Sequence, residues 1–278
     1  MKNLTASVLA LGFALALSAP AQSVEPLALY DNFDGQRINP DLWDPRTIDS
    51  FILDAAREVR NGRLRLFARV YGDTSVTDGG RNLQPLRLFF KNSDAVTSIE
   101  SWVRVNSVNA SGCPVPTGTS SRIGYRISGY YYNDGSGGPG DATGDVWASF
   151  ELRRGSGSTA PPGEMRIITN VFHCQDPACD TGIDLHFDDT TFGTASLGQL
   201  IRLLLEFDPA TNTFAFQRDF QPSVVVPVAI PNLGPPAFRK RIGIRANVEN
   251  CAEAPRPVVD METDVFLVRT NVSAVPPP

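Results

Sequence analysis

The sequence predicts an all-β protein, a two-sheet antiparallel β-sandwich of the jelly-roll type. Apolar and polar side chains alternate over residues 96–105, 122–132 and 144–154, which is the period of a strand with one buried face. Gly, Pro, Asn and Asp punctuate many short runs of this kind, as in sandwiches. After residue 21, no window longer than about ten residues keeps helical periodicity.

The predicted strands follow one another with turn chemistry between them. Asn61-Gly62 is a turn dipeptide, and residues 208–212 between two alternating runs read as a hairpin connection. In order along the chain, strands are expected at 27–33, 51–59, 62–70, 85–91, 96–105, 122–132, 144–154, 163–172, 200–208, 213–219, 224–230, 239–248 and 262–270.

The first 21 residues have the pattern of a secretory signal peptide. A Lys near the start precedes an apolar run from Leu4 to Leu17, and Ser18-Ala19-Pro20-Ala21 supplies a small-residue cleavage site. We therefore expect export to the extracellular space or the periplasm. Residues 22–273 are then a single β-sandwich domain, and residues 274–278 a disordered tail.

Composition and cysteines limit the function classes. The net charge of -5, with Lys scarce beside Arg, excludes the basic footprint of a nucleic-acid binder. Four cysteines suit an oxidising compartment and allow three pairings. A local bridge between Cys174 and Cys179 closes easily over an Asp-Pro turn and would leave Cys113 with Cys251. The alternative is a zinc site, although its spacing matches no standard pattern; its ligands would be His173, Cys174, Cys179 and His186.

The polar side of the alternating strands carries aromatic and charged groups of the kind that bind polar polymers. If these strands share one sheet, its open, concave face presents one patch. The patch comprises Glu100, Trp102, Arg104, Arg126, Tyr130, Trp147, Glu151, Arg153, Arg166, Asn170, Arg245 and Asn247.

Both ends of the chain resemble a known superfamily. Residues 29–35, followed by Trp43, look like the opening strand of the concanavalin A-like lectin/glucanase superfamily. Residues 59–66 resemble its next landmark, a Gly turn leading into an alternating strand, and residues 262–268 resemble its closing strand. The middle of the chain matches in strand rhythm only. The nearest resemblance is to family 16 glycoside hydrolase-like domains.

This resemblance implies a structural calcium ion on the convex side. Its ligands would be the backbone carbonyl of Asn32, the carbonyl of Gly62 and the carboxylate of Asp264. Calcium takes oxygen ligands and accepts backbone carbonyls.

The same resemblance argues against the catalysis of that branch, whose enzymes carry Glu-x-Asp-x-x-Glu on one strand. The matching segment, 145–154, offers only Glu151, whereas retaining hydrolysis needs two carboxylates about 5 Å apart. If the protein is nevertheless an enzyme, Glu151 and Glu100 are the expected acid and base, assisted by Arg126 or Arg153, and His173 is the likelier base of the two histidines. The lyase branch has a Gln-x-His strand and a late Tyr, and neither is found here.

Three functions remain open at this stage. The first is a non-catalytic module in which Trp102, Tyr130 and Trp147 stack on sugar rings while Arg residues favour an anionic polysaccharide or other extracellular polymer. The second is a divergent glycoside hydrolase or polysaccharide lyase. The third is a structural or adhesive surface protein.

Overall fold

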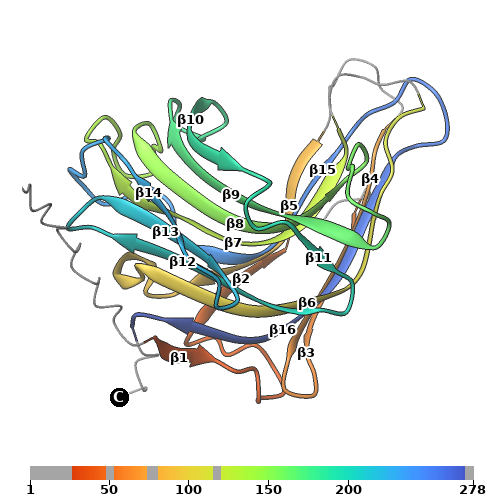
Figure 1. The fold of residues 1–278 in the computed structure, drawn as a ribbon, viewed down its shortest axis with the longest axis horizontal. Helices are drawn as coiled ribbons and strands as arrows, with labels where there is room; N and C mark the ends of the chain where they lie inside the picture. Colours follow the sequence, from red (N-terminus) through yellow and green to blue (C-terminus); the bar gives the residue numbers. More distant parts are fainter. Residues whose placement is uncertain (1–26, 48–52, 74–80, 115–119, 273–278) are drawn as a thin grey trace, which may run out of the picture.

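The structure, a computed structural model, describes residues 27–47, 53–73, 81–114 and 120–272. The predicted signal peptide and tail lie outside these residues. Two antiparallel sheets pack face to face, and Figure 1 shows β7, β8 and β9 as a curved layer above β12, β6 and β16. The predicted two-sheet sandwich is therefore confirmed, and it is the architecture that the superfamily resemblance implied.

The first sheet, sheet A, has the order β14-β13-β12-β6-β16-β4-β3, and β1 pairs with the end of β16. Its long central strands, β6 and β16, come from distant parts of the chain. The strands are β1 Ala28–Asp31, β3 Leu53–Val59, β4 Leu64–Tyr71, β6 Ser98–Ala110, β12 Leu200–Asp208, β13 Thr213–Arg218, β14 Val224–Pro227 and β16 Val258–Thr270.

The second sheet, sheet B, has the order β10-β9-β8-β7-β15-β5-β2, and β11 pairs with β9. A single 3-10 turn, η1 (Ser93–Ala95), interrupts the strands within the described residues. The strands of sheet B are β2 Trp43–Thr47, β5 Arg81–Phe90, β7 Arg122–Asn133, β8 Asp145–Gly155, β9 Glu164–Cys174, β10 Gly182–Asp188, β11 Thr194–Ser196 and β15 Arg241–Val248.

The core lies between the inner faces of the sheets, as the alternation predicts. Val146, Phe150 and Ile127 of sheet B are fully buried, and so are Ile99 and Val103 of sheet A. A side chain of each strand that points away from this layer must lie on an outer face. The alternation therefore determines which side chains can meet a ligand.

Some elements differ from the prediction. The strands β2, β10 and β11 were not expected, and β14 ends at Pro227 rather than at residue 230. β10 is an edge strand with exposed side chains on both faces, so its sequence lacks the apolar alternation that marks a half-buried strand.

Both disulfide bonds of the expected pairing are present. Cys113 is bonded to Cys251, 138 positions away, and Cys174 to Cys179. The alternative zinc site is wrong, because a disulfide consumes both thiolates that would bind the metal. In the described part of the chain, no helix is long and apolar enough to cross a membrane.

Candidate ligand-binding face

The open face of sheet B gathers seven arginines from five neighbouring strands. They alternate with core residues such as Ile127, Phe150 and Ile244, so their guanidinium groups point away from sheet A. We call this surface the arginine face. It consists of Arg87 on β5, Arg241 and Arg245 on β15, Arg122 and Arg126 on β7, Arg153 on β8 and Arg166 on β9.

Four of these arginines were predicted and three were missed. Arg126, Arg153, Arg166 and Arg245 come together as expected. Arg122 and Arg241 could have been found by continuing the alternation along strands that already contributed to the predicted patch, and Arg87 by applying it to the strand expected at 85–91. The polar side chains of Asn170 and Asn247 also lie on this face, half-buried, at the positions expected.

One residue triplet of the predicted patch lies on the other sheet, which corrects the assumption of a single shared sheet. Glu100, Trp102 and Arg104 belong to β6, which pairs with β12 and β16 in sheet A. Their side chains leave the sandwich on the convex side. Arg104 lies over the ring of Phe266, 4.7 Å from its centroid.

Glu100 has a structural environment of its own. It is 2% exposed, and its carboxylate accepts hydrogen bonds from Arg202 Nε at 2.6 Å and Trp102 Nε1 at 2.9 Å. Because packed sheets are about 10 Å apart and Glu100 and Glu151 point in opposite directions, the two carboxylates cannot flank one glycosidic bond. The expected acid and base pair is therefore wrong.

Glu151 lies near the middle of the arginine face and is 4% exposed. Gly124 on β7 makes room for it, because a Cβ there would stand 2.3 Å from Glu151 Oε1. Asp145 is on the same face of β8, but six residues of a strand separate the two by about 20 Å. Glu151 thus has no partner at the spacing that glycoside hydrolysis needs.

Two arginines at the centre of the face are buried without a compensating acid. Arg126 is 4% exposed and Arg241 is 6% exposed. Arg126 donates to Gln84 Oε1 at 3.0 Å, and the guanidinium of Arg241 lies 5.9 Å from the ring centroid of Tyr130. Neither forms an ion pair with a carboxylate of the described chain.

The cost of burying these charges appears in their pKa values. Burial, followed by repulsion from Arg245 and Arg241, holds the pKa of Arg126 well below its ordinary value. Burial lowers the pKa of Arg241 to about 10. The Nε atoms of Arg87 and Arg241 are buried with no hydrogen-bond partner, and a buried guanidinium normally has one. Glu151, directly opposite Arg126 on β8, partly offsets this repulsion, but seven guanidinium groups outnumber the carboxylates of the face.

Phe89 on β5 holds several of these cations together. Its ring centroid lies 4.8–5.7 Å from four guanidinium carbons, those of Arg46, Arg87, Arg239 and Arg241. Cation–π attraction of this kind is worth about 0.5–2 kcal/mol per pair. Among the described residues, Asp44 is the one acid that forms an ion pair with these four arginines: its Oδ2 lies 2.5 Å from a terminal nitrogen of Arg239. The hydrogen bond from Arg239 lowers the pKa of Asp44.

The aromatic residues of the face are largely covered. Tyr130 is 7% exposed and Trp147 is 9% exposed. Both pack in a small cluster with Ala142 and Cys174. The guanidinium of Arg126 lies 5.2 Å from the Trp147 ring centroid, and Trp147 Nε1 has no hydrogen-bond partner. As placed here, these rings offer little flat surface for stacking on sugars, so recognition depends on the arginines.

His173 does not face the arginines. Its Nε2 lies 2.9 Å from Asp134 Oδ2 and its Nδ1 lies 3.2 Å from Gln175 Nε2. Nearby, burial raises the pKa of Asp145 to about 6, although Asn133 and the backbone N–H of Ala237 donate to it. The bond to Asp134 ties the 134–144 loop to β9, and the two bonds to Asp145 join β8 to β7 and to residue 237, so His173 has a structural environment.

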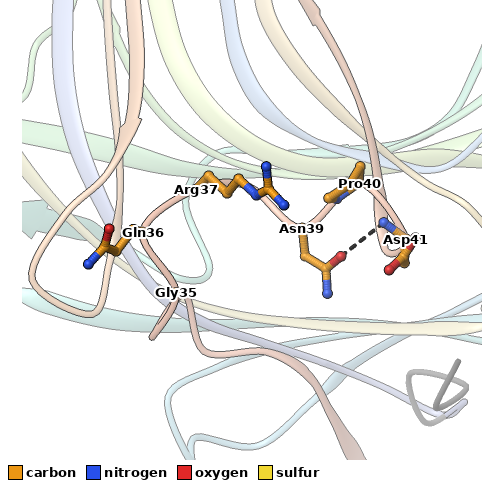
Figure 2. A pocket seen from close by; sticks show the side chains of 6 residues that line it. All are labelled: Gly35, Gln36, Arg37, Asn39, Pro40 and Asp41. Atoms are coloured by element: carbon orange, nitrogen blue, oxygen red, sulfur yellow. Dashed lines mark hydrogen bonds between the residues drawn. The ribbon is translucent and has the colours of Figure 1, made fainter.

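A hollow of about 670 Å³ lies in the connection between β1 and β2, lined by residues Gly35, Gln36, Arg37, Asn39, Pro40 and Asp41. Figure 2 shows that these side chains do not converge on a common point, and the one bond drawn runs from the Asp41 N–H to Asn39 Oδ1, at 2.9 Å. This hollow is exposed and has no converging polar groups, so it is no ligand site.

The expected calcium ligands were tested against the surroundings of Asp264. This residue is 3% exposed on the convex face, and its Oδ1 is buried without a hydrogen bond. A buried carboxylate oxygen without a hydrogen bond is a ligand of the kind that calcium takes. Arg63 Nε stands 3.4 Å from that oxygen and would compete with the ion. Within the described residues, no group of three or more His, Cys, Asp or Glu side chains could hold a metal.

Comparisons with known proteins give likenesses of fold only. No protein-family model matches the chain, and no curated protein matches it. Among solved structures, it is similar to LamAcat from Zobellia galactanivorans, with a TM-score of 0.48 and 10% identity over 87% of this chain and 97% of that one. A Bacillus licheniformis β-glucanase gives a TM-score of 0.44 at 12% identity, over 87% of this chain and 97% of that one. Porphyranase B from Zobellia galactanivorans gives a TM-score of 0.41 at 14% identity, over 91% of this chain and 97% of that one. Likenesses this distant say nothing about what the chain binds.

Proposed function

We propose that the protein is a non-catalytic module that binds an anionic polysaccharide through the arginine face. The observation that carries this proposal is the burial of Arg126 and Arg241 without an ion pair to a carboxylate of the described residues, in a face where Glu151 is the one buried acid opposite Arg126. Burying an unpaired cation is costly, and a ligand oxyanion would supply the missing charge and acceptors.

The chemistry of the face suits an acidic polymer. A guanidinium presents a planar fork of donors that matches a carboxylate, and arginine is also less strongly hydrated than lysine. The chain as a whole carries a net charge of -5, so the positive potential is local to this face. A negatively charged polymer would be attracted to one side of the sandwich only.

Catalysis is less well supported. A hydrolase needs a second carboxylate near Glu151, and Glu100 lies on the opposite sheet. Export to an extracellular or periplasmic space is proposed on the strength of the two disulfide bonds. A stabilising calcium at Asn32, Gly62 and Asp264 is part of the same proposal.

The test is a binding assay with polygalacturonate as the acidic polymer and laminarin as a neutral one. We expect the wild-type protein to bind polygalacturonate, more weakly as salt rises, because the contacts are ionic. Arg126→Gln and Arg241→Gln should each reduce the affinity at least tenfold. Arg65→Gln is the matched control, since Arg65 lies on the outer face of sheet A, paired with Glu262.

Three outcomes would overturn the proposal. One is binding of laminarin and polygalacturonate with equal affinity. Another is equal loss in the Arg65 control. The third is release of reducing ends or unsaturated products from either polymer, which would identify an enzyme instead.

A further inference from the structure

A pocket of about 380 Å³ lies at one end of the arginine face, where β7 begins, β8 ends and β9 begins. Three guanidinium groups from three adjacent strands line it, together with one carboxylate and several small polar residues. The lining residues that matter are Arg122, Arg153, Arg166, Asp189, Ser158 and Thr159.

The charges in this pocket are unbalanced. Arg153 and Arg166 are directly opposite each other on β8 and β9, and like charges in that position are destabilising. Arg166 is neutralised by Asp189, at 2.5 Å, and also donates to Thr159 Oγ1. That leaves two guanidinium groups of the pocket without an ion-paired acid.

Arg122 and Arg153 carry those two guanidinium groups. The guanidinium carbon of Arg153 lies over the ring of Phe187, 5.9 Å from the ring centroid. Neither forms an ion pair with a carboxylate in the described ranges. Burial, and then the positive charges of Arg153 and Arg245, lower the pKa of Arg122, and the negative charge of Glu151 offsets this only in part. An anion between the guanidiniums would relieve this repulsion.

We propose that this pocket binds a sugar unit carrying an acidic group, and that it is a second subsite for the same polymer. This inference rests on the proposed function. The pocket volume of about 380 Å³ is far larger than the roughly 30 Å³ that one water takes in the liquid. A sugar ring therefore fits in the pocket together with its acidic group. The hydroxyl groups of Ser158 and Thr159 are placed to bond the ring hydroxyls.

The distance between the two subsites predicts how affinity depends on polymer length. Arg122 and Arg126 are four residues apart on β7, or about 13 Å along the strand. A short oligosaccharide can fill only one subsite. A longer one fills both and gains affinity, because the second contact is intramolecular.

The experiment measures Kd by calorimetry for oligogalacturonides of one to eight units. The wild type should show a rise in affinity of at least tenfold once the chain spans both subsites. The double variant Arg122→Gln/Arg153→Gln should lose that rise and keep its affinity for the shortest ligands that bind at Arg126. Arg122→Lys keeps the charge but loses the fork, and should give an intermediate result. A parallel series of carrageenan oligosaccharides, which carry sulfate groups and no carboxylate, tells sulfate from carboxylate recognition.

The outcomes separate this inference from the proposed function. If the double variant binds every length as the wild type does, with unchanged thermal unfolding, the pocket is no subsite, even though Arg126→Gln still weakens binding. If Arg126→Gln has no effect while the double variant loses binding, the pocket is retained and the proposed central site is overturned. If the double variant loses affinity equally for oligosaccharides of all lengths, the predicted dependence of affinity on length is wrong, and the pocket is not a second subsite.

Discussion

Replacing Arg241 by methionine tests whether the arginine face is kept for binding at the expense of stability. Methionine preserves most of the apolar stem and its contact with Phe89, and removes the charge. Arg241 is 6% exposed and has no carboxylate partner in the described chain. If Arg241 served only the fold, its replacement would be expected to destabilise the protein. A binding residue with a buried, unpaired charge should do the opposite.

The magnitude follows from the pKa of Arg241, which burial lowers from 12.5 to about 10. One pKa unit is worth about 1.36 kcal/mol, so burial of the charge costs about 3 kcal/mol. Loss of the cation–π attraction between Arg241 and Phe89 removes about 1 kcal/mol. The net increase in the free energy of unfolding is about 2 kcal/mol, or a rise in Tm of roughly 4–8 °C.

The assay combines thermal unfolding at pH 7 with calorimetric titration of polygalacturonate. Lys240→Met is the control, because Lys240 precedes Arg241 but points into the sandwich. Its Nζ donates to the Ser93 carbonyl at 3.0 Å, and burial lowers its pKa from 10.5 to about 8. Both variants should therefore raise Tm, and only Arg241→Met should weaken binding. A lower Tm in Arg241→Met, or equal loss of binding in both variants, would refute the reasoning.

Further predictions concern pH, the disulfides and calcium. Because the folded pKa of Asp145 is raised to about 6, the folded state binds its proton more tightly, and stability should fall as pH rises from about 4 to 6. Asp145→Asn should flatten that dependence in unfolding measured across this range, and an unchanged slope would exclude Asp145 as its source. Removing the Cys113–Cys251 bond, which closes a loop of 138 positions, should lower the free energy of unfolding by about 5 kcal/mol, measured in denaturant. Removing the Cys174–Cys179 bond, which closes a short loop, should lower it by about 2 kcal/mol. Equal losses would contradict the loop-entropy estimate. A chelator should lower Tm in the wild type but not in Asp264→Ala, and a wild-type Tm unmoved by EDTA would rule out the proposed calcium.

Much of the arginine face could be predicted from local pattern. Arg126, Glu151 and Arg153 were assigned to the open side because a strand directs alternate residues to opposite faces. The burial of Arg126 and Glu151 could not be predicted, since Glu151 lies over Gly124 of the neighbouring strand β7 and Arg126 contacts Gln84 and Trp147 on other strands. The same holds for Tyr130 and Trp147, which alternation places on the face but which the 134–144 loop and its neighbours cover.

The sequence by itself determined the all-β class, the inward and outward side of each long strand, and the easy local closure of Cys174 with Cys179. These follow from interactions between residues near one another in the chain. Only the tertiary structure decided which sheet each strand joined. Strand β6 pairs with β12 and β16, about 100 and 160 positions away, so Glu100 and Trp102 face away from Glu151 and Trp147. Alternation specifies two faces for every strand, but it contains no information on which partner a strand will find.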